Sequence, residues 1–141
     1  MTPRRLIPLA LQALAGILSL AASLYGGLVL YVRGDQAHVG FSLVACIPLI
    51  LILPFFCFSF FQARTSAILQ WIAAFTFLGA DVLFSVRNCP ASHPCPGFFR
   101  MVLNSFFTPM TMFVLLIAAL QTLAIYTRTS EQISQGLPRS T

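Results

Sequence analysis

The sequence carries very little charge. Of its 141 residues, 8% are charged and 58% are hydrophobic, and it has no lysine and only 3 acidic residues. A soluble domain has about 25% charged residues, because its surface must be hydrated. The low charge excludes a soluble globular enzyme and an extended disordered protein. The net charge of +5 does not indicate a nucleic-acid partner, because the arginines are scattered and form no phosphate-neutralising patch. The composition predicts an integral membrane protein whose solvent is the lipid bilayer.

Four long runs of the chain are apolar, and only the third contains an ionisable acid, Asp81. The runs are residues 6–32, 41–62, 66–86 and 101–126. A helix that rises 1.5 Å per residue needs about 20 residues to cross the hydrocarbon core. Barrel strands are excluded, because they alternate in polarity and last about 10 residues. The short connections between the runs make neighbouring helices antiparallel. The sequence therefore predicts an all-α fold, an antiparallel four-helix transmembrane bundle.

The arginines indicate the orientation of this bundle. Four crossings place both termini on one side, which holds five arginines against three on the other side. The positive-inside rule then favours cytosolic termini. We predict a cytosolic N-terminus over residues 1–5, a transmembrane domain over residues 6–126 and a cytosolic tail over residues 127–141, which is polar and expected to be disordered. In a eukaryote such a protein lies in the secretory pathway or the plasma membrane.

The four cysteines form two pairs with different surroundings. Cys46 and Cys57 lie in the second run, where cysteine is a small apolar side chain. Cys89 and Cys95 lie in the proline-rich segment NCPASHPCPG, and an oxidising compartment favours a disulfide between them. Free thiols, or a metal site that includes His93, are the alternatives. These donors are too close for a usual zinc site, so we predict no metal and no cofactor. The chain lacks the CxxC pair of membrane thiol oxidoreductases, and this disfavours that enzyme class.

Asp81 and Asn104 are polar residues inside the predicted membrane region. Asp81 lies five residues before the end of its run, about 7.5 Å deep at helical rise. An acid within a span is costly and is by default a candidate functional residue. We expect a structural role instead, with a hydrogen bond across helices to Asn104. The alternative is that Asp81 serves a small transporter, or an accessory membrane enzyme that acts on a hydrophobic metabolite.

Small residues and prolines predict how the helices pack. Pro48, Pro54 and Pro109 are expected to kink their helices, with Thr108 or Thr111 bonding freed carbonyls near Pro109. In the first run, small residues recur at every fourth position, a pattern that lets another helix approach closely. This stripe serves the internal bundle, a homo-oligomer or another membrane protein. It consists of Ala15, Ser19, Ser23 and Gly27.

The chain resembles the small MARVEL-type membrane proteins that are abundant in filamentous fungi. The resemblance covers residues 5–127 and depends on the four runs, the cytosolic termini and the short second turn Ala63-Arg64-Thr65. It also includes the acid-bearing stretch WIAAFTFLGADVLF and the cysteine-bearing loop after it. The resemblance implies a non-enzymatic multi-pass protein, without catalytic residues, that acts in membrane apposition, vesicle trafficking or sorting.

Overall fold

The computed structural model describes residues 3–33, 40–87, 89, 94 and 97–136 of the chain. Within these residues it contains helices and no strand. The five helices are α1 (Pro3–Arg33), α2 (Gly40–Phe58), α3 (Ala63–Arg87), α4 (Phe98–Phe106) and α5 (Pro109–Ser134). The all-α class predicted from the sequence is therefore confirmed.

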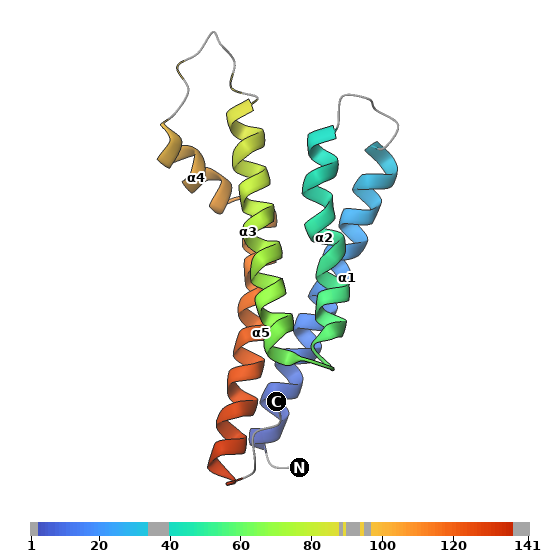
Figure 1. Cartoon of the computed structure of the whole chain (residues 1–141), viewed down its shortest axis with the longest axis vertical. Helices are drawn as coiled ribbons and strands as arrows, with labels where there is room; N and C mark the ends of the chain where they lie inside the picture. The colour runs from blue at the N-terminus through green and yellow to red at the C-terminus, as the bar shows by residue number, and fades with distance from the viewer. Residues whose placement is uncertain (1–2, 34–39, 88, 90–93, 95–96, 137–141) are drawn as a thin grey trace.

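The four long helices lie side by side. Helix α1 contacts α2 and α5, and α3 also contacts α2 and α5, so each long helix has two long neighbours. The start of α1, the turn between α2 and α3, and the end of α5 lie at one end, which we term the terminal end (Figure 1). At this end α1 and α5 extend past the α2–α3 turn (Figure 1). Helix α4 packs mainly against α3 at the opposite end.

Many large apolar side chains face outward, and the interior combines small and polar side chains with a core of larger apolar ones such as Ile52, Phe77 and Ile117. Ile17, Leu24 and Tyr31 are 66%, 65% and 85% exposed. The buried set includes Ala15, Ala22, Ala73, Ala74, Ala118, Ser19, Ser66, Gln70, Thr111 and Gln121. A water-soluble fold buries its large apolar residues and exposes its polar ones. The exposed large apolar residues and the buried polar ones are typical of a protein surrounded by lipid, where small residues let helices pack closely.

Within the described part of the chain, three helices are long and apolar enough to cross a membrane. They contain the stretches Leu6–Val32, Ala63–Arg87 and Pro109–Ser134. In α2, the stretch Cys46–Phe58 is apolar but shorter, and the side chains of residues 40–45 are not among those described. The predicted second run extends to residue 62, but α2 ends at Phe58, because Ser59–Gln62 form the turn into α3.

The predicted small-residue stripe on α1 is correct in part. Ala15 and Ser19 are fully buried, and the Ser23 hydroxyl reaches α2. At Gly27, however, an added Cβ would meet nothing within 4 Å, whereas at Gly26 it would lie 2.8 Å from the Leu49 Cβ. Gly27 therefore lies outside the α1–α2 contact, and its role in packing against another chain stays a prediction. With 3.6 residues per turn, every fourth position rotates about 40° further around the helix, so the stripe drifts away from α2.

Ser23 also compensates for a proline in α2. Pro54 has no N–H, so the Ile50 carbonyl lacks its usual helical donor. The Ser23 Oγ lies 3.1 Å from the carbonyl oxygens of Ile50 and Leu49, and it accepts a hydrogen bond from the Leu53 N–H at 3.1 Å. The Ser23 hydroxyl of α1 thus supplies a hydrogen-bond partner to the α2 backbone near Pro54 and links the two helices.

The predicted fourth span, residues 101–126, is wrong as a single helix. Helix α4 ends at Phe106, and Thr108 is extended, with φ −61° and ψ 137°, before Pro109 begins α5. The proline ring disfavours a helical conformation in the preceding residue, so the chain breaks at Thr108. The Thr108 hydroxyl donates to the Ser105 carbonyl at 2.6 Å. This is the carbonyl that Pro109 deprives of a donor, so the prediction for Thr108 is confirmed.

The predicted start of the disordered tail at residue 127 is also wrong. Helix α5 continues to Ser134 and is followed by Gly136 with φ +64°. A glycine in this left-handed region is a common helix stop signal. Arg128 donates to the Gln12 side chain on α1, which ties the last turns of α5 to the bundle. The polar composition of this segment reflects a helix that extends beyond its apolar part, and residues 137–141 lie outside the described residues.

Candidate functional site

Asp81 and Asn104 are not joined as predicted. Asp81 is half-buried on α3, and its Oδ2 accepts a hydrogen bond from the Thr108 hydroxyl at 3.4 Å. Asn104 is exposed on α4. The helix break at Thr108 explains the difference, because it turns α4 away from the axis of α5 and brings Thr108 to Asp81. The Thr108 hydroxyl is nearer to the Ser105 carbonyl, so its contact with the carboxylate is the weaker of the two.

The cysteines of the predicted disulfide are described only in part. Cys89 is half-buried just after α3, and its backbone N–H donates to the Val86 carbonyl at 3.4 Å. Cys95 lies outside the described residues, so their pairing stays a prediction. In α2, Cys46 is buried and Cys57 is exposed, and both are thiols. Within the described residues, no three or more His, Cys, Asp or Glu side chains form a group that could hold a metal ion.

A buried polar cluster joins three helices near the terminal end. The Gln121 amide on α5 donates to the Ser66 hydroxyl on α3, and Ser66 donates to the Phe55 carbonyl on α2. One turn along α3, the Gln70 amide donates to the Ile52 carbonyl at 2.9 Å. Such bonds between helices replace the water that lipid cannot supply.

Two buried polar atoms in this region have no hydrogen-bond partner. They are the Ser59 Oγ, in a residue that is 9% exposed, and the Gln121 Oε1, in a residue that is 3% exposed. Both residues line a recess of about 20 Å³. A space of roughly 10–15 Å³ holds one water, and a water needs polar partners of this kind. The recess is also lined by Gln12, Ala15, Phe56, Ala63, Ala124, Ile125 and Arg128.

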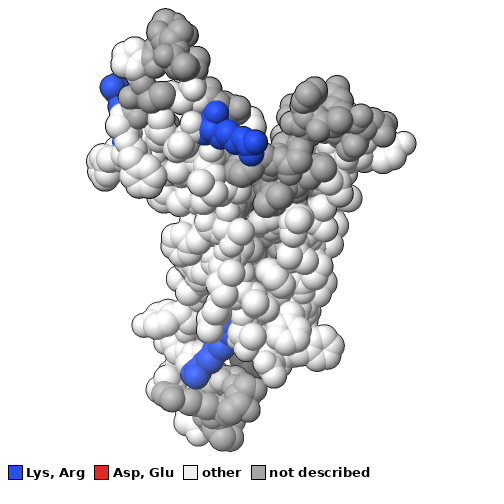
Figure 2. All heavy atoms as spheres, turned by 45° about the horizontal axis from the view of Figure 1, so that its top comes forward, with Lys and Arg blue, Asp and Glu red and all other residues white. Residues whose placement is uncertain are grey.

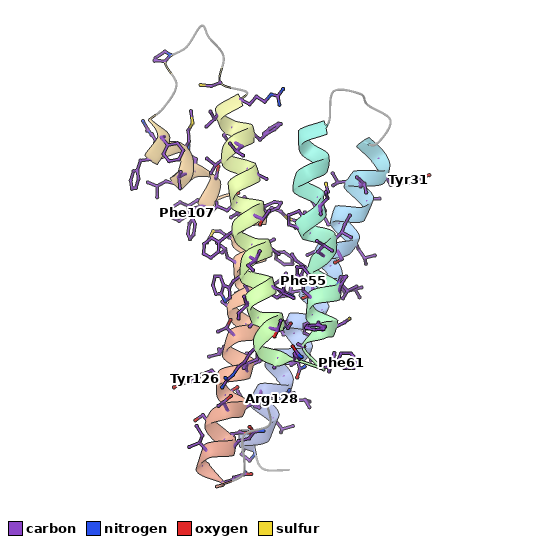
Figure 3. The ribbon with its side chains drawn as sticks, in the orientation of Figure 1. Tyr31, Phe55, Phe61, Phe107, Tyr126 and Arg128 are labelled. Carbon is purple, nitrogen blue, oxygen red and sulfur yellow. The ribbon has the colours of Figure 1, made fainter. Side chains whose placement is uncertain are left out.

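A larger groove of about 780 Å³ adjoins this recess, and Ser59, Ala63, Ile125 and Arg128 line both. The α2–α3 turn and the first residues of α3 form one wall, and the last turns of α5 form the other. Arg128 on α5 and Phe61 in the turn lie at the same end of the molecule (Figure 3). The groove is lined by residues 59–65, Ile125, Arg128, Thr129 and Gln132, a set that contains two arginines and no carboxylate.

This groove cannot be read from the sequence, because its two walls are about 60 residues apart in the chain. The pair of glutamines inside otherwise apolar runs, Gln70 and Gln121, is a signal only for the buried polar cluster. The groove offers guanidinium, hydroxyl and amide donors, which suit an anion. Comparisons with family models, with curated proteins and with solved structures give no match to this chain.

Proposed function

We propose that the chain is a non-enzymatic, four-span membrane protein that organises membranes or sorts cargo in vesicle trafficking, as its resemblance to MARVEL-type proteins implies. The observation that supports this most is the surface of large apolar side chains around an interior that includes many small and polar residues. Such a surface is stable in lipid and would aggregate in water. Its partners are the bilayer itself and other membrane proteins, including copies of this chain.

Helix α2 is the fourth span of this proposal. Its 19 residues correspond to about 28 Å of helix, close to the roughly 30 Å of a hydrocarbon core. It contacts both α1 and α3. Its outward residues are apolar, with Ile47 54% and Leu51 39% exposed. An α2 that remained outside the bilayer would leave this surface in water.

The charge distribution supports an orientation with cytosolic termini. Figure 2 shows arginine atoms towards both ends of the molecule and none across the middle of the visible face. Arg64 and Arg128 lie at the terminal end, where the first turn of α1 contains Arg4 and Arg5, whereas Arg33, Arg87 and Arg100 lie towards the opposite end. An excess of arginine on one side favours that side as cytosolic.

Reporter sites test the topology directly. An Asn-x-Ser acceptor inserted between residues 90 and 96 should be glycosylated, and one inserted at Gln62 should not. Tags at both chain ends should be digested together when protease is added to the cytosolic side of sealed membranes. Opposite protection of the two tags would contradict four spans. Glycosylation only at residue 62 would indicate the opposite orientation, with both termini outside the cytosol.

Loss of the protein tests the biological role. We expect altered delivery of membrane cargo in cells that lack it, with full rescue by the intact chain. An unchanged cargo distribution, together with the loss of uptake or conversion of a small molecule, would instead support the transporter or enzyme alternative.

A further inference from the structure

We propose that the groove at the terminal end binds the phosphate-bearing headgroup of an anionic phospholipid. The headgroup is held by Arg64, Arg128, the first turn of α3 and the Ser59 hydroxyl. This inference depends on the proposed embedding in a membrane, and it adds a specific ligand to that function.

Two arginines from different helices face one groove. Arg64 belongs to the first turn of α3 and Arg128 to the last turns of α5, and both line the cavity. Arg128 uses its Nη2 to bind Gln12, which positions the guanidinium and leaves its other N–H donors for a ligand. Arginine suits phosphate because its planar donors can bind two oxygens at once. Glu131 lies on the same helix but is not among the lining residues.

The N-terminus of α3 adds donors to the same wall. The first helical N–H groups of a helix have no carbonyl partner within it. Here the Ser66 N–H already bonds the Gln62 carbonyl, whereas Ala63, Arg64 and Thr65 come before it and line the groove. The aligned peptide dipoles of this 25-residue helix also favour negative charge at its start.

The Ser59 hydroxyl is independent evidence for a ligand. Its Oγ is buried and has no hydrogen-bond partner, and the residue Ser59 lines both the groove and the inner recess. A buried polar atom without a partner is costly, so such atoms usually face a bound molecule or water. Ser59 can donate to a phosphate oxygen in the groove. A water in the recess would then satisfy the Gln121 Oε1 behind it.

The rim of the groove favours a lipid over free phosphate. Phe60 and Phe61 line the groove and are 69% and 82% exposed. Exposed phenylalanines beside two arginines suit a molecule that has acyl chains next to its phosphate. A free anion has no apolar part that could contact these two rings. Basic pockets between membrane helices on the cytosolic side are known to bind anionic headgroups.

The test compares lipid binding by the purified full-length chain. The chain is placed in nanodiscs of phosphatidylcholine with a minor fraction of phosphatidylinositol phosphate, and the retained lipid is counted by native mass spectrometry. One arginine near an anionic surface contributes roughly a fivefold gain in binding, so Arg64→Gln should lower retention about fivefold and the double change with Arg128→Gln about 30-fold. Ser59→Ala should lower it severalfold.

The matched controls are Arg87→Gln and Arg100→Gln, which remove the same charge at the opposite end. They should retain the lipid as the unchanged chain does. Equal losses at both ends, no preference for the anionic lipid, or full competition by millimolar inorganic phosphate would each overturn the proposal. Arg64 is exposed, so Arg64→Gln remains informative if the double variant fails to fold. Failure of the chain to enter nanodiscs would instead contradict the membrane embedding.

Discussion

Gly26→Ala tests the closest contact between α1 and α2. A Cβ at residue 26 would lie 2.8 Å from the Leu49 Cβ, 3.3 Å from the Ile50 Cγ1 and 3.4 Å from the Cys46 carbonyl oxygen. The nearest of these atoms is fixed to the backbone, so no rotamer change can remove the overlap. The helices must move apart. Gly27 is the matched control, because its added Cβ would meet nothing within 4 Å.

The size of the effect follows from two opposing contributions. Carbon atoms pack at roughly 3.5–4.0 Å, so α1 and α2 must separate by about 1 Å near residue 26. Overpacking of this kind costs about 1–3 kcal/mol. Alanine is better than glycine in a helix by about 0.8–1.0 kcal/mol, and this gain applies at both positions. This propensity gain is the same in both variants and cancels when their stabilities are compared. Gly26→Ala should therefore be about 1–3 kcal/mol less stable than Gly27→Ala.

Unfolding in mixed micelles with increasing sodium dodecyl sulfate measures this difference. The chain has one tryptophan, Trp71, whose indole N–H donates to the Thr122 hydroxyl at 2.9 Å between α3 and α5. Its fluorescence reports the loss of helix packing. If Gly27→Ala proves as destabilising as Gly26→Ala, the side of α1 that we assign to the α2 contact is wrong.

Three further predictions concern other contacts. Ser23→Ala should lower the free energy of unfolding by about 0.6–1.7 kcal/mol, because a proline-freed carbonyl of α2 loses its donor. Ser19→Ala removes only a bond within α1 and should cost less, so equal losses would contradict this role. Asp81→Asn should keep membrane abundance and cellular phenotype, since the amide oxygen still accepts a hydrogen bond, whereas Asp81→Leu should lower abundance. Normal abundance of the Asn variant with complete loss of function would support a proton-carrying or substrate-binding acid. Cys89 and Cys95 should resist alkylation until they are reduced, and reduction should cost about 2–3 kcal/mol of stability; labelling of both in unreduced protein would exclude the disulfide.

The existence of the long helices and the extent of α1 and most of α3 could be predicted from the sequence, whereas the extent of α5 could not. The runs 6–32 and 66–86 lie within α1 and α3, whereas Pro109, predicted to kink one helix, begins α5 instead. These predictions succeed because a helix in lipid satisfies its backbone within the segment itself. An apolar run of about 20 residues is then sufficient to predict a helix. A proline changes the backbone only of its immediate neighbours, so its effect is also local.

The pairing of helix faces was decided by tertiary structure. Gly26 and Gly27 are equivalent in sequence, and only the rotation of α1 against α2 makes one of them a close contact. Asp81 likewise contacts Thr108 because the chain bends at Thr108. It does not contact Asn104, although the sequence places Asn104 at a similar depth. The groove between residues 59–65 and the end of α5 depends on two segments that meet only after α3 and α5 have packed. Such contacts depend on the side-chain volumes and crossing angles of all the packed helices together. A local pattern of residues does not specify these quantities.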